Sequence, residues 1–409
     1  MVEKFDKHIL IWGDSPHAKT GFGRVIREII RYLPQTWKFT IVGINHPDIF
    51  TYISEDQRIK IIPTKITSDN LMGNELTISL YSKENYDLLF VLNDLDVTSP
   101  LATRFATIRD SHKATRKKYT PILYYFPVDG PMLGSIDFLK IANTNVTYTQ
   151  WAKEILRPLL PKTIKIEVIP HGTDVGVFKP INKANRRELR QKLFHVFNDD
   201  IFVIVNVNTN SARKDLFQCI QALKAIKETG LPTFMYLHSE AVSYGFNLYN
   251  MSQAIGLQYG KDLLFGIPSL LRQEDTIINT IYNAADCFLT TSRREGWGLS
   301  STEAAAAGCS VVAPNYGPFT ENFNDGRGYL FEPDSLIWTK DDNRGYGYFS
   351  TTKTISNKLI EVRKEQNTKA QEQKILKARE YTQGISWEKL GPQWIEMFTI
   401  TMDTHATSN

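Results

Sequence analysis

Two glutamates flank a glycine-rich stretch in the segment EGWGLSSTE, residues 295–303. Gly296 and Gly298 have no Cβ, so the backbone there can adopt positive φ angles and approach a ligand closely. The alanine run at 304–307 predicts a helix that starts near Ser300. The first amides of a helix have no internal partner and lie at the positive end of its dipole. This part of the chain therefore suits an anionic or hydroxyl-rich ligand.

The two glutamates differ in how well a purely structural role explains them. Ser300 and Glu303 fit the S-x-x-E capping box, in which the glutamate only returns to the amide of the N-cap residue. Local sequence favours that role and ligand binding equally for Glu303. Glu295 precedes the glycines, in a loop predicted after a strand at 287–292, where ligand sites of open sheets lie. It has no comparable structural role.

A pair of cations, Arg213 and Lys214, follows the apolar segment IFVIVNVN. Arginine offers a bidentate fork and lysine a point charge, and both stabilise negative charge that grows on a leaving phosphate oxygen. A solvated helix start is the ordinary explanation of such a pair. Its place at the carboxyl end of a predicted strand favours phosphate binding instead.

Several other motifs are weaker signals. Gly21 and Gly23, in HAKTGFGRV, could admit a ligand near the first helix, but the full G-x-G-x-x-G fingerprint of dehydrogenases is missing. Asp129, in YYFPVDGP, is equally well explained as a turn residue and as a site residue. The motif NDLD at 93–96 has the letters of a metal site, but we interpret it as a helix start and predict no metal. The basic segment HKATRKK at 112–118 suits a lipid head group, a polyanionic acceptor, nucleic acid or a solvated helix end.

Short apolar segments alternate with helical patterns along most of the chain. The predicted strands are HILIW, FTIVGI, IKIIP, LLFVL, ILYYF and IEVIP, followed by IFVIVNV, FMYLH, LLFG, CFLTT and SVVAP. Helices are predicted between them, for example at 23–32, 215–227, 276–285 and 301–307. Most strands are apolar at consecutive positions, as in parallel sheets that are covered on both faces. The alternation predicts βαβ units.

A segment rich in Gly, Pro, Asn and Asp, residues 171–187, interrupts this alternation. We therefore expect an α/β fold of two doubly wound, Rossmann-like domains, residues 1–180 and 181–385. Because ligands of such sheets bind beyond the carboxyl ends of the strands, two facing domains would form a deep cleft. A closing helix is predicted over 386–409, with Ser386 as its N-cap and with a kink or break at Pro392.

Composition sets limits on the class of protein. The chain has 409 residues, 42% of them hydrophobic, and a net charge of +4, which is too small to indicate nucleic acid. Its three cysteines, Cys219, Cys287 and Cys309, lack metal-site or disulfide spacing and suggest reduced thiols. No apolar segment approaches the ~18–20 residues that cross a bilayer. We expect a cytoplasmic protein, with peripheral membrane contact left open.

The segment NAADCFLTTSRREGWGLSSTEAAAAGCSVVAPNYGPFTE resembles the signature of retaining glycosyltransferases of the GT-B fold, sequence family four, also called glycosyl transferases group 1. VIPHGTDVGVFKP resembles the family's interdomain segment, with His171 in place of the usual Asn, and GISWEKLGPQWIEMF resembles its closing helix. NTNSARKDL, 208–216, resembles its phosphate site, although Arg and Lys are adjacent here instead of several positions apart. The overall pattern is similar to that of members encoded by large DNA viruses such as the chloroviruses. The resemblance is good from about residue 145 onward and weak before it.

The resemblance implies a role for each matching position. Glu295 would contact the hydroxyls of the donor sugar, and the E-x7-E partner Glu303 would bind the ribose of the nucleotide. Arg213, Lys214 and Asp129 would act at the reacting centre, although many members have a histidine near the position of Asp129. The remaining donor-binding positions would be Gly21, Phe22, Gly23, Asn208, His238, Gly266, Ile267, Gly296, Trp297, Gly298 and Leu299.

The function implied is transfer of a hexose, with retention, from a nucleotide-diphosphate sugar to an acceptor hydroxyl, with the first domain binding the acceptor and the second the donor. Family frequency slightly favours GDP-mannose over UDP-hexoses, and no other cofactor is expected. A glycan, glycolipid or glycoprotein is the expected acceptor, and nucleic acid is less favoured. Three alternatives remain: a nucleotide-sugar epimerase or sugar phosphorylase of the same fold, a glycosidase that uses the glutamate pair, and a sugar-binding module without activity.

Overall fold

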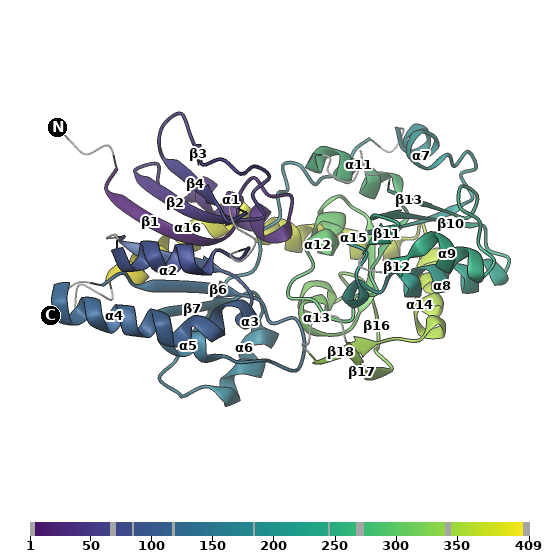
Figure 1. Ribbon diagram of the computed structural model, residues 1–409. Coiled ribbons are helices and arrows are strands. Elements are labelled where there is room, and N and C mark those ends of the chain that lie inside the picture. The colour runs from purple at the N-terminus through teal and green to yellow at the C-terminus, as the bar shows by residue number, and fades with distance from the viewer. Residues whose placement is uncertain are drawn as a thin grey trace. The chain divides into compact units, whose positions relative to one another are not determined.

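The computed structural model describes residues 5–65, 71–83, 86–116, 119–182, 185–243, 246–266, 274–339 and 345–403. The chain divides into two compact units, each an α/β structure (Figure 1). Unit 1 contains Met1–Val128, Leu133–Gly172 and Trp387–Asn409, and unit 2 contains Asp129–Met132 and Thr173–Ser386. The division thus falls at Gly172, and the short segment Asp129–Met132 belongs with unit 2.

Unit 1 contains one sheet that is parallel except for its edge strand β3, which runs antiparallel to β4. In sheet order the strands are β3 (Tyr52–Ile53), β4 (Ile59–Pro63), β2 (Trp37–Ile44), β1 (Lys7–Asp14), β5 (Leu88–Leu92), β6 (Ile122–Phe126), β7 (Thr144–Thr147) and β8 (Ile166–Val168). The central strands β5 and β6 are buried at every position, because helices cover both faces of the sheet.

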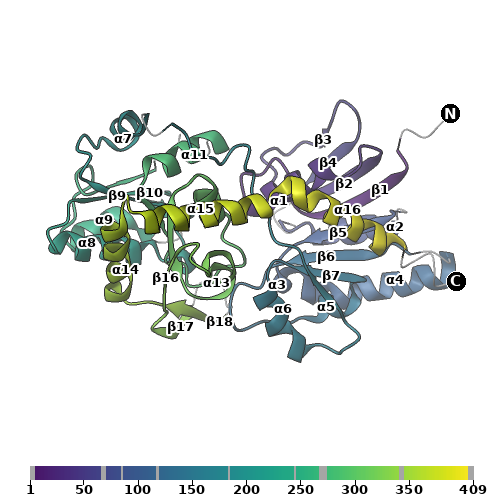
Figure 2. The same ribbon diagram turned by 180° about the vertical axis from the view of Figure 1, so that it is seen from behind.

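The helices of unit 1 lie on the two faces of this sheet. They are α1 (Gly21–Tyr32), α2 (Asn74–Lys83), α3 (Leu95–Thr98), η2 (Ser99–Leu101), α4 (Ala102–Arg116), α5 (Asp137–Ile141), α6 (Gln150–Leu156), η3 (Arg157–Leu159) and α16 (Trp387–Asp403). Helices α2 and α4 lie in front of the sheet in Figure 1, whereas α16 lies in front in Figure 2 and therefore covers the opposite face.

The closing helix α16 completes the core of unit 1. Trp394 and Phe398 are fully buried, and their rings lie 6.0 and 5.1 Å from the ring of Phe90 in β5. Pro392 lies inside this helix, which continues through it, so of the predicted kink or break the break does not occur and the kink stays a prediction. A proline inside a helix costs about 3 kcal/mol. Burial of the two aromatic side chains offsets that cost.

Unit 2 contains a fully parallel sheet of β13 (Leu263–Phe265), β10 (Thr233–His238), β9 (Phe202–Val207), β14 (Cys287–Leu289), β15 (Ser310–Pro314) and β16 (Tyr329–Phe331), in that order. Its helices are α7 (Arg186–Phe194), η5 (Ala212–Lys214), α8 (Leu216–Glu228), α9 (Leu248–Ala254), α11 (Asp275–Ala284), α12 (Leu299–Ala306), α13 (Gly317–Phe323), α14 (Thr352–Glu365) and α15 (Lys369–Gly384). Two antiparallel hairpins add β11 (Val242–Ser243) with β12 (Phe246–Asn247), and β17 (Ser335–Thr339) with β18 (Gly345–Phe349).

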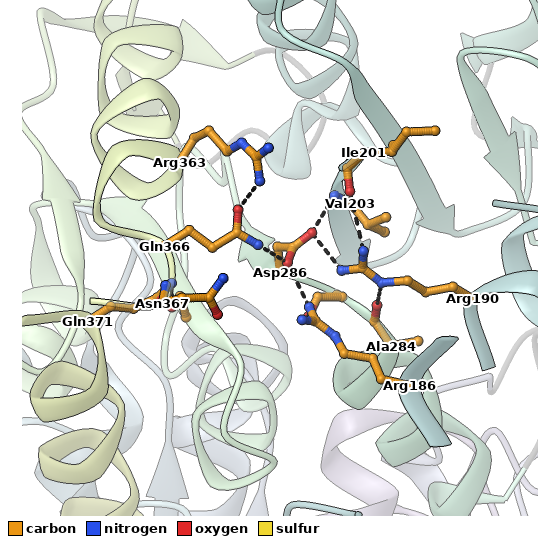
Figure 3. A network of polar contacts seen from close by, with 12 residues as sticks. Arg186, Arg190, Ile201, Val203, Ala284, Asp286, Arg363, Gln366, Asn367 and Gln371 are labelled. Atoms are coloured by element: carbon orange, nitrogen blue, oxygen red, sulfur yellow. Dashed lines mark hydrogen bonds and ion pairs between the residues drawn. The ribbon is translucent and has the colours of Figure 1, made fainter. Parts of the chain in front are cut away.

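A buried carboxylate, Asp286, lies just ahead of strand β14 and is hydrogen-bonded to three other parts of unit 2 (Figure 3). Its oxygens accept hydrogen bonds from Arg190 (2.6 Å) and Arg186 (2.7 Å), from the amide of Val203 (2.7 Å) and from Gln366. These partners come from α7, from β9 and from the turn after α14. Since Arg190 and Asp286 are both almost fully buried, each charge depends on the other.

The three cysteines are buried and form no disulfide with one another. Within the described ranges, no helix is both long enough and apolar enough to cross a membrane.

Candidate active site

The candidate site lies at the carboxyl edge of the unit 2 sheet. Arg213 and Lys214 lie in η5, which follows β9, and Glu295 lies in the loop that follows β14. Strands β9 and β14 are neighbours and run parallel, with Phe288 opposite Val205. Their carboxyl ends therefore meet, which brings together side chains that are 81 residues apart in sequence.

The Glu295 carboxylate forms ion pairs with both Arg213 and Lys214. Its Oε2 forms a short ion pair with Lys214 Nζ and lies 3.5 Å from Arg213 Nη1. The side chains of Lys214 and Glu295 are 10% and 12% exposed, whereas the Arg213 side chain is 37% exposed. Two cations surround one carboxylate, so the cluster has an excess positive charge. A lysine ammonium carries three N–H donors, which leaves Lys214 able to bind an anion as well.

Burial and charge set the protonation of this pair. Burial lowers the pKa of Lys214 to about 8, although the nearby Glu295 carboxylate opposes that shift. For Glu295, burial acts to raise the pKa, but attraction by Lys214 and Arg213 outweighs it and holds the pKa below 4.5. At neutral pH the carboxylate is therefore ionised and the ammonium mostly protonated.

Asp129 lies against the same loop. Its Oδ1 accepts a hydrogen bond from Arg294 Nη2 (2.9 Å), and its carbonyl oxygen accepts one from the amide of Glu295 (2.8 Å). Arg294 is fully buried, so the ion pair with Asp129 compensates its charge. Asp129 thus holds the loop that carries Glu295, and its carboxylate already has a protein partner.

The glycine turn shapes the start of α12. Gly298 is the N-cap residue, with φ +85°, and a Cβ there would lie 2.9 Å from Phe319 Cε1. Of the two alternatives for Glu303, the capping box is excluded, because Ser300 lies inside the helix and no side chain caps it. Glu303 is instead buried in α12, where its Oε2 accepts a hydrogen bond of 3.4 Å from the hydroxyl of Tyr282.

Several residues that the sequence did not single out hold the loop in place. Tyr316 donates its hydroxyl to Ser292 O (2.7 Å), and its ring stacks on Tyr348 at 4.2 Å. The amide of Tyr348 donates to Arg293 O, and Asn322 donates to Trp297 O. Tyr316 lies within the signature segment, but Tyr348 lies well beyond it, so only the folded chain brings the two rings together here. Arg294 adjoins Glu295, and its complete burial could not be predicted from its sequence.

The other predicted donor-binding residues of unit 2 lie at or near the same edge of the sheet. His238 ends β10, and Gly266 follows the neighbouring strand β13, where its amide donates to Leu237 O (2.8 Å). Asn208 follows β9 and donates to Asn206 Oδ1 (3.1 Å). Burial lowers the pKa of His238 to about 4, so its ring is neutral at pH 7. Ile267 lies outside the described residues.

The predicted glycine loop belongs to unit 1. Gly21 and Phe22 open α1, and Thr20 caps that helix by accepting from the amide of Gly23 (3.0 Å). A Cβ at Gly23 would lie 2.6 Å from Ser15 O, so packing alone requires glycine there.

Comparison with known proteins identifies the domain that holds this site. Residues 185–337 match the family model of glycosyl transferases group 1. The chain carries a glycosyl transferases group 1 domain. The matched range contains Arg213, Lys214 and Glu295. The match identifies the chain as a glycosyltransferase. A comparison with curated proteins finds no significant match.

The whole chain resembles solved structures at low identity. HepE from Anabaena, solved with UDP and glucose, gives a TM-score of 0.70 at 17% identity over 97% of this chain and 100% of that one. Sucrose-phosphate synthase from Thermosynechococcus elongatus gives 0.69 at 15%, covering 98% and 100%. The catalytic domain of starch synthase IV from Arabidopsis thaliana, bound to ADP and acarbose, gives 0.67 at 14%, covering 97% and 99%. The predicted GT-B fold of two Rossmann-like units is thereby confirmed.

Proposed function

We propose that this glycosyltransferase moves a hexose, with retention, from a nucleotide-diphosphate sugar to an acceptor hydroxyl. The convergence of Arg213 and Lys214 on the buried Glu295 supports the proposal most directly. The two cations bind the diphosphate and stabilise the charge that grows on the leaving oxygen. Glu295 accepts hydrogen bonds from the sugar hydroxyls, and the amides of Gly296–Leu299 help to hold the sugar.

The state of Glu295 favours attack on the donor from the side of the leaving group. A carboxylate nucleophile would have to leave its ion pair with Lys214, which costs the compensation of a buried charge. In the reaction we propose, the acceptor oxygen bonds to the anomeric carbon while the bond from that carbon to the phosphate oxygen breaks. The acceptor proton passes to the leaving phosphate. Glu295 then orients the sugar and forms no covalent bond.

The nucleotide itself would bind toward β10 and β13. His238 Nε2 and Ser239 Oγ are buried there and have no hydrogen-bond partner within the described chain. Such groups gain a partner when a base or ribose binds beside them. Glu303 is the proposed ribose ligand. GDP-mannose remains slightly favoured by family frequency, and UDP-glucose, with which HepE was solved, is the main alternative donor.

Calorimetric titration tests the donor site. The full-length protein would be titrated with GDP, UDP, ADP and their mannose, glucose and N-acetylglucosamine conjugates. We expect one nucleotide to bind, and Arg213→Ala to weaken it at least ~30-fold, because a hydrogen-bonded charge contact is worth roughly 2 kcal/mol. Arg187→Ala is the matched control, since Arg187 is exposed and pairs only loosely with Asp199 at 3.7 Å. Failure of every nucleotide to bind would refute the proposal.

Turnover of Glu295→Gln tests the role of the carboxylate. The amide keeps the shape of the side chain but loses its charge, so we expect transfer to fall by a factor of about 10²–10³. Nuclear magnetic resonance of the product gives the anomeric configuration. An inverted product would contradict retention, and wild-type turnover in Glu295→Gln would contradict the assigned role.

A further inference from the structure

The unit 1 sheet, like the unit 2 sheet, has an edge of the kind at which parallel sheets bind ligands. Strand β1 pairs with β2 on one side and with β5 on the other, and the chain forms β2 and β4 before it returns to β5. The order of the strands therefore reverses between β1 and β5. In open α/β sheets, ligands bind beyond the carboxyl ends of the strands at such a reversal.

Four polar residues lie at this edge. Asp14 is the last residue of β1, Asn93 and Asp94 directly follow β5, and Tyr148 directly follows β7. Asp14, Asn93 and Tyr148 are 7%, 4% and 2% exposed. Asn93 and Asp94 belong to the NDLD motif. Asp94 stands at the N-cap of α3, but its side chain makes no capping hydrogen bond, so capping does not account for it.

Two of these residues have a buried side-chain atom without a hydrogen-bond partner among the described residues. Asn93 Nδ2 and the hydroxyl of Tyr148 have no hydrogen-bond partner in the part of the chain that the structure describes. The neighbouring buried tyrosines differ, because Tyr124 bonds Thr98 Oγ1 (2.7 Å) and Tyr125 bonds Ile169 O (2.9 Å). Most buried polar groups are paired, and an unpaired one costs free energy. A ligand that accepts from both groups would remove this cost.

The same edge carries two carboxylates. Asp14 accepts hydrogen bonds from Thr20 and from Asn45 (3.2 Å), and each of its oxygens has capacity for another donor. Burial raises the pKa of Asp14, and the charge of Asp94 raises it further. Burial likewise raises the pKa of Tyr148, and the charge of Asp94 raises it further.

We propose that Asp14, Asn93, Asp94 and Tyr148 bind a neutral pyranose ring, and that this ring belongs to the acceptor, which rests on the proposed function. Sugar hydroxyls would donate to the two carboxylates and accept from the amide and the phenol. The paired carboxylates would repel phosphate and other anions. The site thus selects an uncharged saccharide over a phosphorylated sugar or a nucleic acid.

Tyr148→Phe is the decisive variant, because it removes only the unpaired hydroxyl. Loss of a group without a protein partner should leave the melting temperature unchanged or raise it. Affinity for the saccharide should fall about tenfold, the effect of one lost hydrogen bond. Tyr125→Phe is the matched control, since its hydroxyl has protein partners. That variant should lower the melting temperature by about 2–4 °C and leave saccharide affinity unchanged.

Binding would be measured by saturation-transfer nuclear magnetic resonance on the full chain. The probes are the methyl glycosides of glucose, mannose and galactose, with glucose 6-phosphate as the anionic counterpart. A saturating nucleotide occupies the donor site of unit 2. We expect at least one glycoside to bind and the phosphate ester to bind more weakly.

Three results would overturn this inference: no glycoside binds, Tyr148→Phe binds as the wild type does, or glucose 6-phosphate binds best. The proposed function fails separately, when no nucleotide binds in the calorimetric titration. Nucleotide binding without glycoside binding therefore removes only the unit 1 site.

Discussion

Among the individual residues, Lys214 and Glu295 depend most on each other. Both are buried, and each has its pKa moved by the other and by loss of water. Without Lys214, the Glu295 carboxylate would lie largely uncompensated in a place of low solvation, with only the more exposed Arg213 close by. In the proposed function, the pair thus places a carboxylate for the sugar hydroxyls directly beside an ammonium for the phosphate.

The lowered pKa of Lys214 predicts how nucleotide binding depends on pH. A bound diphosphate raises the pKa of the Lys214 ammonium. The affinity for the nucleotide is therefore highest below pH 8, the pKa of about 8 that Lys214 has in the free protein, and falls as the pH rises through that value. Between pH 7 and pH 9 we expect a loss of about tenfold. Calorimetric titration over this range measures it, with Lys214→Met as the variant that should bind weakly and lose this dependence. A wild-type affinity that stays constant to pH 9 would contradict the assignment.

Gly298 is the residue that most restricts the loop. Its φ of +85° is unfavourable for residues with a Cβ, and the added atom would lie 2.9 Å from Phe319. We expect Gly298→Ala to cost about 1–3 kcal/mol and to reduce turnover by displacing Glu295. Urea unfolding and steady-state kinetics would show both effects. Gly230→Ala is the control, because its φ is +86° but no atom lies within 4 Å of the added Cβ, so its cost should be smaller and turnover normal.

Among the elements, α7, β9 and the turn between α14 and α15 are joined through Asp286. Removing the charge of Asp286 would leave the buried Arg190 guanidinium without its counter-ion (Figure 3). We expect Asp286→Asn to destabilise unit 2 by about 3–5 kcal/mol. Asp199→Asn is the comparison, since the exposed pair of Asp199 with Arg187 should contribute at most about 1 kcal/mol.

Urea unfolding followed by tryptophan fluorescence measures both variants. Because the second substitution Arg190→Met removes the orphaned charge, it should recover part of the loss in Asp286→Asn. Equal stability of Asp286→Asn and Asp199→Asn would show that the network contributes little.

In the molecule as a whole, both ends of the chain build unit 1. Helix α16 returns to it and buries Trp387, Leu390, Trp394 and Phe398. At about 2 kcal/mol for each side chain, these contribute about 8 kcal/mol, which is comparable to the stability of an entire domain. Unit 2, by contrast, contains nearly all of its own chain between Thr173 and Ser386.

Truncation after Ser386 should therefore unfold unit 1 and spare unit 2. We expect limited proteolysis to degrade the region before Gly172 in the truncated protein, while the nucleotide still raises the melting temperature of the remaining transition. The full-length protein is the control. Resistance of both units to proteolysis after truncation would show that α16 is dispensable.

The sequence predicted the central strands well. LLFVL, ILYYF and SVVAP coincide with β5, β6 and β15, because a strand buried on both faces needs apolar residues at consecutive positions. Strand β7, TNVT, was not predicted, since its polar letters do not show that β6 and β8 lie on either side of it. Helix α12 starts at Leu299, next to the predicted Ser300, but a left-handed glycine begins it and not the capping side chain that the sequence offered.

The candidate active site, like the fold, could be predicted from the sequence only in part. The sequence by itself determined which residues carry charge beside a glycine turn, namely Glu295, Arg213 and Lys214, since residue type and local spacing are written in the chain. Only the tertiary structure decided that β9 and β14 are neighbours, that Lys214 meets Glu295, and that Asp129 belongs to the buried Arg294. It alone left the Tyr148 hydroxyl and Asn93 Nδ2 buried and without a hydrogen-bond partner within the described residues. The physical reason is that strand order and burial arise from contacts between distant segments, which no local pattern of residues specifies.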